Sequence, residues 1–389
     1  MDKVRVGVIG VGNMGTVHCK NIAGGKVPGM ALTAVCDINP DRLAWAKKEL
    51  PADVARFSDA EQMMRSGLID AVIVATPHYL HPPLVIKALK HGLHAMSEKP
   101  AGVYTKQVRE MNEAAAKSGK VFGIMYNQRT DPLYRRMREI VSSGEMGAVK
   151  RTNWIITNWY RPQCYYDSGS WRATWAGEGG GVLLNQCPHN LDLWQWICGM
   201  PCLVRAFCHN GKWHDIEVED DVTAYVEYPN GATGVFVTST ADAPGTNRFE
   251  ITLEGGKLVC ENGSLQEYKL EMNERKFCRT TKKAFGSPKC TFTEYKPKGN
   301  GLQHVGVLRA FAGAILRGEP LVARGEEGIR GLSISNAMHL SSWLGKPVTL
   351  PIDEDLFYSE LKKRIASSKV KNVQSVISDT NGSYGGAKA

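Results

Sequence analysis

The sequence of 389 residues predicts an α/β protein in which a doubly wound parallel sheet is followed by an α+β region with a mainly antiparallel sheet. Short, continuously apolar segments alternate with helical segments in the first third of the chain, as in a parallel sheet covered on both faces. Longer segments of alternating polarity follow, joined by Asn-Gly turns. With 43% hydrophobic residues, a chain of this length is expected to form two domains.

The first domain is expected to span residues 1–126. Its strands are predicted from five apolar segments: 3–10, 31–37, 70–77, 92–100 and 120–127. Helical segments such as 41–50 and 82–92 lie between them and provide the crossovers that parallel strands require.

The second domain is expected to span residues 127–366, and it begins with a helix at about 132–143. Alternating strands are predicted at four places: 148–159, 222–228, 231–240 and 248–256. Two further helices are expected at 304–316 and 326–345. Residues 367–389 are polar and rich in Gly and Ser, so they are predicted to form a flexible tail.

Composition excludes several classes of protein. No apolar segment approaches the roughly 20 residues that span a bilayer, and the N-terminus enters a strand without a signal peptide, so a cytoplasmic protein without a membrane partner is expected. Ten scattered cysteines fit reduced thiols and predict no metal site. The net charge of +9 is dispersed except at 273–283 and 361–371, which argues against a nucleic-acid partner and leaves an anionic substrate possible.

A glycine motif after the first strand predicts a dinucleotide site. Gly10, Gly12 and Gly15 form GxGxxG, with Asn13 and Met14 between them, and a helix can start there. Asp37 ends the second strand 22 residues after the last glycine (37−15), where a carboxylate can bind the ribose hydroxyls and repel a 2′-phosphate. The predicted cofactor is therefore NAD rather than NADP.

Residues 178–196, EGGGVLLNQCPHNLDLWQW, combine apolar and polar residues at helical spacing. On a helix, Asn185, His189 and Asp192 fall within roughly 60° of one another, opposite a packing face. Pro188 is expected to bend or break this helix beside His189. Asp192 is expected to have a structural role, orienting a side chain or capping nearby backbone.

Three segments of the sequence together resemble one family. They are ATPHYLHPPLVIKALKHGLHAMSEKPAG (75–102), YNQRTDPLYRRMREIVSSGEMGAV (126–149) and GGGVLLNQCPHNLDL (179–193). Their order and content resemble the Gfo/Idh/MocA family of glucose-fructose oxidoreductases and inositol dehydrogenases, over roughly residues 3 to 350. The resemblance implies a Rossmann domain followed by a domain whose open sheet backs the active site and forms subunit contacts, hence a homo-oligomer, either a dimer or a tetramer.

The resemblance also implies roles for individual residues. The family's catalytic lysine corresponds to Lys99 and its catalytic histidine to His189, and the Lys99–Pro100 peptide is expected to be cis. Asn185 stands where many inositol dehydrogenase-like members have Asp, which weakens an inositol assignment. Cofactor contacts are implied at the ends of the predicted strands 70–77 and 92–100 and in the loop that follows the first of them. The residues are Thr76, Pro77, His78, His81, Glu98 and Lys99.

The chemistry of these residues agrees with such roles. Oxidation of a secondary alcohol requires a base, and an imidazole has a suitable pKa near 6.5. Lys99 can orient the hydroxyl group and stabilise alkoxide character, and Asn185 can hold a neighbouring hydroxyl. On its own, a histidine in a Trp-rich helix is more often a packing residue.

The segment 158–178, NWYRPQCYYDSGSWRATWAGE, is dense in aromatic and arginine side chains. Such groups bind the apolar faces and polar edges of sugar rings, although half of them are expected simply to pack the loop. The substrate contacts predicted here are Tyr166, Trp171, Arg172 and Trp175. Arg129 is a further candidate for the substrate or cofactor edge.

These observations predict an NAD-dependent oxidoreductase that acts on a ring secondary hydroxyl of a sugar or glycoside. An alternative is a redox-neutral glycosidase that uses bound NAD for transient ring oxidation and elimination of the aglycone. A third possibility is a regulator that binds NAD or a sugar as a signal. Net production of NADH separates the first two.

Overall fold

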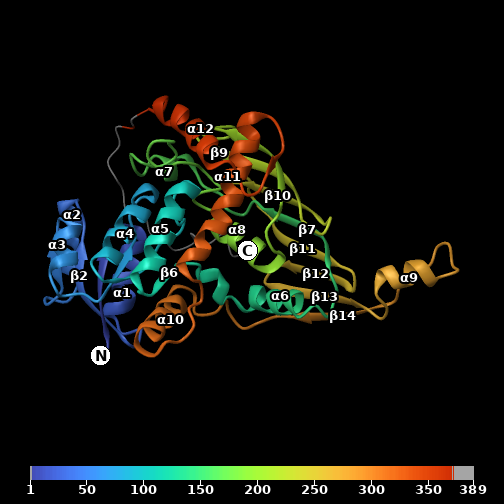
Figure 1. The fold of residues 1–389 in the computed structure, drawn as a ribbon, viewed down its shortest axis with the longest axis horizontal. Helices are drawn as coiled ribbons and strands as arrows, with labels where there is room; N and C mark the ends of the chain where they lie inside the picture. The colour runs from blue at the N-terminus through green and yellow to red at the C-terminus, as the bar shows by residue number, and fades with distance from the viewer. Residues whose placement is uncertain (1, 370, 372–389) are drawn as a thin grey trace.

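The computed structural model describes residues 2–369 and 371, and it contains two sheets (Figure 1). The first sheet and its helices, blue to teal in Figure 1, lie at one end of the molecule, and the second sheet, mostly green to orange, lies at the other. Helix α11 (Gly328–Leu344) contacts both α5 (Thr105–Ser118) and strand β8 (Leu203–Asn210), so it packs between the two sheets.

The first sheet has six parallel strands in the order β3-β2-β1-β4-β5-β6. The strands are β1 (Val4–Ile9), β2 (Met30–Cys36), β3 (Ala55–Phe57), β4 (Ala71–Val74), β5 (His94–Ser97) and β6 (Phe122–Ile124). The helices between them are α1 (Asn13–Ala23), α2 (Pro40–Glu49), α3 (Ala60–Arg65), α4 (His81–Lys90) and α5. The predicted doubly wound sheet is confirmed, and its order reverses between β1 and β4, where ligands of such sheets bind.

The second sheet has nine strands in the order β14-β13-β12-β11-β7-β10-β9-β8-β15. The strands are β7 (Val149–Ile156), β8, β9 (Glu219–Glu227), β10 (Thr233–Ser239), β11 (Asn247–Leu253), β12 (Gly256–Glu261), β13 (Ser264–Leu270), β14 (Cys290–Tyr295) and β15 (Val348–Thr349). Strands β7 and β10 are parallel, and the other pairs described in this second sheet are antiparallel. The predicted, mainly antiparallel sheet is therefore confirmed.

One face of this second sheet is covered by helices α6 (Pro132–Ser143), α8 (Pro188–Cys198) and α11. The ring of Trp194 in α8 stacks on Phe236 of β10 at 5.3 Å between centroids, and Trp154 of β7 stacks on Phe249 at 4.2 Å. The side chains that alternate with these core residues lie on the opposite face, and those of Ile155, Phe207, Tyr225 and Val235 are exposed.

The remaining elements are short or lie outside the two sheets. They are η1 (His78–Leu80), η2 (Asn127–Thr130), α7 (Gln163–Tyr166), α9 (Glu274–Thr280), α10 (Gln303–Arg317), η3 (Gly325–Glu327) and α12 (Glu354–Ala366). Helix α10 packs against the first sheet, although it lies far along the chain in the range predicted for the second domain. No helix of the described residues is long and apolar enough to span a bilayer. The predicted tail, 367–389, lies outside the described residues except for 367–369 and 371.

The helix predicted over the glycine-rich segment is shorter than expected. Helix α8 begins at Pro188, and residues 182–187 form turns instead. A proline has no N–H to donate and fits the first helical position, so it starts the helix rather than continuing it. The expected break beside His189 is confirmed, whereas the expectation that Asn185 shares a helix with His189 is wrong.

Candidate active site

The glycine loop between β1 and α1 has the shape of a phosphate-binding turn. Gly10 has a φ of +87°, and a Cβ on Gly15 would lie 1.8 Å from the carbonyl oxygen of Gly10. A Cβ on Gly12, by contrast, would meet no atom within 4 Å. Gly12 is also the N-cap of α1, where backbone N–H groups attract anions. The loop is thus closed on its protein side and open where a pyrophosphate would approach, so the residues present fit NAD.

Asp37 lies immediately after β2, beside this loop. Its Oδ2 accepts a hydrogen bond from the backbone N of Val11 (2.7 Å), and its Oδ1 accepts one from the backbone N of Asn39 (2.9 Å). The guanidinium of Arg42 donates to the carbonyl of Val11 and to the hydroxyl of Thr16. Asp37 therefore also fixes the loop, a role that the sequence does not reveal, and each of its oxygens keeps lone pairs for ribose hydroxyls.

The loops after β4 and β5 lie side by side at the carboxyl edge of the first sheet. Both ring nitrogens of His81 lie 2.7 Å from backbone carbonyls, those of Pro100 and Thr76, and the side chain is buried. Nδ1 of His78 lies 3.1 Å from the carbonyl oxygen of Glu178. The prediction that His81 contacts the cofactor is therefore not retained, because the protein itself occupies both of its nitrogens. His78 joins this loop to the turn that carries Asn185.

Glu98 is buried and paired with His18 of α1 at 2.6 Å, and its other oxygen accepts a hydrogen bond from the backbone N of Lys99. Burial would raise the pKa of Glu98, but the hydrogen bond to His18 and the positive charges nearby lower it to about 2. Both oxygens thus have protein partners, and Glu98 supports the backbone of Lys99. The peptide from Lys99 to Pro100 is cis, which confirms that prediction.

Lys99 and His189 meet where the two sheets approach each other. The Nζ of Lys99 donates to the backbone carbonyl of Asn185 (2.8 Å), so the loop after β5 and the turn before α8 are joined. His189 lies in the first turn of α8, with its ring 6.3 Å from the ring of Tyr126. Burial lowers the pKa of His189 well below its usual value, and the charge of Lys99 lowers it further. The imidazole is therefore neutral and able to accept a proton at neutral pH.

Burial also lowers the pKa of Lys99, whereas the carboxylates of Glu98 and Glu178 oppose this effect. Glu178 is a site residue that the sequence analysis missed. Its carboxylate accepts a hydrogen bond from the side-chain amide of Asn185, and the side chain is buried behind that amide. An acidic residue directly before three glycines is the one signal in the sequence that could have pointed to it.

The aromatic segment divides into partly exposed residues and buried residues. Trp171 and Arg172 are partly exposed, and the guanidinium of Arg172 lies 4.7 Å from the Trp171 ring and 4.6 Å from the Tyr165 ring. Tyr166 is buried, with its hydroxyl donating to Thr240 (2.7 Å). Trp175 is buried and packs edge-on to the rings of His339 and Trp343. The two buried residues pack the loop and are not retained as substrate contacts.

Arg129 is also withdrawn as a substrate contact. Its side chain is 2% exposed, and its nitrogens donate to both oxygens of Asp192 (2.8 and 2.7 Å) and to Glu327 (2.8 Å). Asp192 thus orients a side chain, as expected. These ion pairs leave Arg129 buried inside the protein, away from any ligand.

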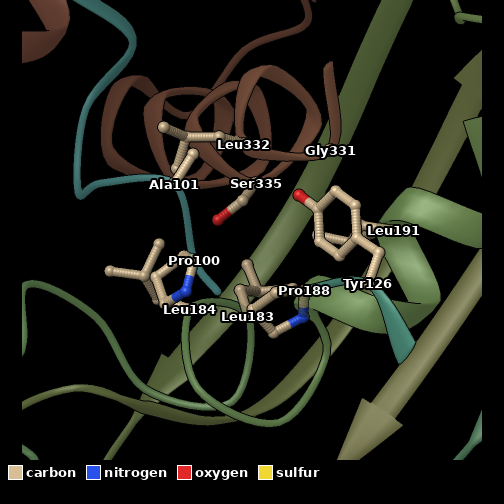
Figure 2. Close-up of a pocket in the computed structure, with 10 residues that line it drawn as sticks. All are labelled: Pro100, Ala101, Tyr126, Leu183, Leu184, Pro188, Leu191, Gly331, Leu332 and Ser335. Carbon is tan, nitrogen blue, oxygen red and sulfur yellow. The ribbon is translucent and has the colours of Figure 1, made fainter. Parts of the chain in front are cut away.

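The turn before α8 rests on an apolar floor. Figure 2 shows Leu183, Leu184 and Pro188 of the turn facing Ala101 and, on α11, Leu332, around a narrow pocket. Gly181 is required in this turn, because a Cβ there would lie 2.0 Å from the carbonyl oxygen of Glu219. Packing on this floor fixes the turn and hence the position of Asn185.

Comparisons with known proteins agree with this geometry. Residues 4–126 match the model of an oxidoreductase family with an NAD-binding Rossmann fold, and residues 134–259 match the model of the GFO/IDH/MocA C-terminal domain. The chain is 25% identical to the myo-inositol 2-dehydrogenase of Thermotoga maritima over 340 residues, which cover 86% of this chain and 95% of that protein.

Solved structures give similar matches. The WlbA dehydrogenase of Chromobacterium violaceum, solved with NADH and UDP-GlcNAcA, is 26% identical with a TM-score of 0.77, over 91% of this chain and 97% of that one. A levoglucosan dehydrogenase solved with NADH and levoglucosan has a TM-score of 0.75 over 90% of this chain and 100% of that one. Its sequence identity is 20%, so this second match shows a shared fold.

Proposed function

We propose, from the premise that the chain belongs to the GFO/IDH/MocA family of NAD-binding oxidoreductases, that it oxidises a ring secondary hydroxyl group of a sugar or glycoside to a ketone, or catalyses the reverse reduction. The observation that carries this proposal is the convergence of Lys99, Asn185 and His189 beside the nucleotide loop. Two relatives support the substrate class, since one is named for an inositol and the other was solved with a nucleotide sugar.

In this proposal each polar group of the active site has one task. Bound NAD would supply the acceptor for the hydride that leaves the carbon carrying the hydroxyl group. The neutral imidazole of His189 accepts the hydroxyl proton. The ammonium of Lys99 orients the same hydroxyl and stabilises the negative charge that develops on its oxygen. Asn185 holds a neighbouring hydroxyl.

The partly exposed side chains of the aromatic segment suit a sugar ring. Trp171 and Arg172 are partly exposed, and Tyr165 lies against the guanidinium of Arg172. Aromatic faces pack on the C–H surface of a ring, while the guanidinium and hydroxyl groups bind its polar edge. We therefore keep Trp171 and Arg172 as proposed substrate contacts and add Tyr165. Asn185 in place of Asp favours a sugar or glycoside over a free inositol.

We also propose that residues 1–126 form the NAD-binding domain and residues 127–366 the substrate-binding domain. The exposed apolar side chains on the outer face of the second sheet support a homo-oligomer formed through this sheet. Light scattering on the purified protein measures its oligomeric state. A monomer at micromolar concentration would contradict this part of the proposal.

The activity is tested with NAD and a panel of p-nitrophenyl glycosides, methyl glycosides, free sugars and myo-inositol. NADH and nitrophenolate absorb at different wavelengths, so oxidation and aglycone release are followed together. NADH produced in proportion to substrate supports the dehydrogenase. NAD-dependent release of nitrophenolate without net NADH establishes the redox-neutral glycosidase instead. Binding of NAD and sugars without turnover of any substrate contradicts an enzymatic role and leaves the regulator.

A further inference from the structure

Glu178 places a buried carboxylate directly against the side-chain amide of Asn185. Its side chain is 2% exposed, and its backbone carbonyl faces His78. Its Oε2 accepts a hydrogen bond from the backbone N of Ala173 (2.6 Å), and its Oε1 accepts one from Nδ2 of Asn185. Both donors are N–H groups, so each oxygen of the carboxylate acts as an acceptor.

This pairing fixes which way the amide of Asn185 points. An amide can present either its oxygen or its nitrogen, and its orientation follows from its hydrogen-bond partners. The backbone N–H of Ala173 is a donor that cannot be exchanged, and an ionised carboxylate accepts only. Glu178 therefore requires an N–H group from Asn185, and the amide oxygen must point the other way.

Tyr165 fixes the same orientation from the opposite side. Its hydroxyl oxygen accepts hydrogen bonds from Arg172 (2.9 Å) and from Gln186 (3.3 Å). The single hydroxyl proton is then available for an acceptor, and the Oδ1 of Asn185 lies 3.4 Å away. Two independent neighbours thus hold the amide with its oxygen towards Tyr165 and its nitrogen towards Glu178.

Charge gives Glu178 a second influence on the site. Burial raises the pKa of Glu178, whereas the charge of Arg172 and the hydrogen bonds from Ala173 and Asn185 oppose this rise. The ionised carboxylate in turn favours the protonated form of Lys99. Glu219, the other buried acid near this turn, instead accepts hydrogen bonds from the backbone of Gly181 and Leu183 and pairs with His339. Glu219 thus supports the turn, whereas Glu178 acts on the side chain of Asn185.

We propose that Glu178 is a positioning residue of the active site: its carboxylate holds Asn185 with the amide oxygen towards Tyr165, a proposed substrate contact, so that Asn185 is a hydrogen-bond acceptor for a hydroxyl group of the substrate. The effect of Glu178 on activity rests on the proposed function. The orientation of the amide does not, because it follows from Ala173, Asn185 and Tyr165 alone.

A charge-swap series tests this orientation. In E178Q, the side-chain oxygen of the glutamine accepts the hydrogen bond from the backbone N–H of Ala173, so its NH2 group faces Asn185. The amide of Asn185 must then rotate, which turns its own NH2 group towards Tyr165. We expect kcat/KM to fall about 10- to 100-fold, the effect of losing one charge-assisted hydrogen bond. In N185D two carboxylates meet, and a similar loss is expected. In E178Q/N185D the glutamine NH2 group donates to one oxygen of the carboxylate introduced at position 185. The other carboxylate oxygen then faces Tyr165, and kcat/KM recovers to within about 10-fold of wild type.

The probes are NAD and p-nitrophenyl β-D-glucopyranoside, with the melting temperature measured for every variant. E261Q, which removes a carboxylate from an ion pair with Arg248 on the second sheet, is the matched control and should keep wild-type kinetics. If E178Q keeps the kcat/KM of the wild type, or if the losses of the two single variants multiply in the double variant, the proposal is overturned.

The melting temperatures separate this proposal from the proposed function, because they need no substrate. If E178Q and N185D each lower the melting temperature and the double variant restores it, the orientation of the amide is supported even if the wild type oxidises no sugar. If the wild type is inactive and the effects on melting temperature are additive, the orientation is overturned on its own.

Discussion

At the scale of single residues, burial sets the protonation states that the proposed reaction requires. The desolvation of His189 keeps its imidazole neutral, and a neutral imidazole can accept a proton whereas an imidazolium cannot. Lys99 is only partly buried, and two carboxylates oppose the lowering of its pKa. The pair thus combines a neutral base with a cation that can neutralise developing negative charge.

Substitution of His189 or Lys99 should strongly slow turnover and leave NAD binding intact. We expect H189A and K99A to lower kcat by roughly 10²- to 10⁴-fold, the usual contribution of a positioned acid or base. NAD affinity, measured by calorimetric titration, should stay within a few-fold of wild type, because the glycine loop is built separately. A folded H189Q with near-normal activity would show that His189 only packs the core.

Asp37 should determine the choice between NAD and NADP. Its carboxylate holds the glycine loop through Val11 and repels a 2′-phosphate. We expect the wild type to bind NAD more tightly than NADP, and D37N to narrow the difference because the charge is lost. The amide oxygen keeps the hydrogen bond from Val11 that holds the glycine loop, and only the hydrogen bond from Asn39 is lost. Fluorescence titration with both cofactors measures the ratio. Equal or tighter binding of NADP by the wild type would contradict this assignment.

Some site residues were predictable from local sequence, and others were not. Lys99 follows a strand and His189 follows a proline, so each position depends on its neighbours in the chain. Trp175, by contrast, is buried by His339 and Trp343, more than 160 residues later (339−175 = 164). No local pattern reveals such partners, which is why the sequence analysis predicted Trp175 as a substrate contact. Glu178 was missed although its partners Ala173 and Asn185 lie only five and seven residues away, because the turns that bring them together do not follow a helical or strand spacing.

At the scale of elements, hydrophobic spacing identified the segment before α8 correctly as packed, but it could not determine where the helix begins. The spacing of apolar residues from Leu183 to Trp194 fits one continuous helix. Pro188 overrides this pattern because it occupies the first helical position. The resulting turn brings the backbone carbonyl of Asn185 to Lys99, a contact that a continuous helix would have used internally.

Alanine substitutions at Gly12 and Gly15, the last two glycines of the nucleotide motif, should have different effects. A Cβ on Gly12 meets open space, whereas a Cβ on Gly15 collides with the carbonyl of Gly10. We expect G12A to keep the melting temperature of the cofactor-free protein and to lose at least about 10-fold in NAD affinity, because the methyl group occupies the approach of the pyrophosphate. G15A should instead melt at a lower temperature. Unchanged NAD affinity in G12A would show that the cofactor does not approach this loop.

At the scale of the whole molecule, segments late in the chain complete the core of the first sheet, whose strands come from residues 1–126. Helix α10 adds Val307, Leu308 and Phe311 to the core of the first sheet, and α11 packs against both α5 and β8. The sequence predicted two units and their secondary structure. It could not predict that α10 would return to the first sheet, because amphipathic spacing shows that a helix has a buried face without showing which surface covers it.

Arg129 joins three separate parts of the molecule. It lies in η2, its bidentate partner Asp192 lies in α8, and Glu327 lies in η3, immediately before α11. Asp192 is as deeply buried as Arg129, so removal of the guanidinium leaves its carboxylate buried with the amide of Gln195 as the one remaining side-chain donor among the described residues. Such unpaired buried charges cost about 3–5 kcal/mol.

We therefore expect R129M to lower the free energy of unfolding by about 3–5 kcal/mol, measured by urea denaturation followed by tryptophan fluorescence. R129M/D192N should recover part of this loss, because the second change removes the stranded charge. At a temperature where R129M is folded, its KM for sugar should stay within a few-fold of wild type, since the guanidinium reaches no ligand. A variant of normal stability with a strongly raised KM would return Arg129 to the substrate edge, where the sequence first placed it.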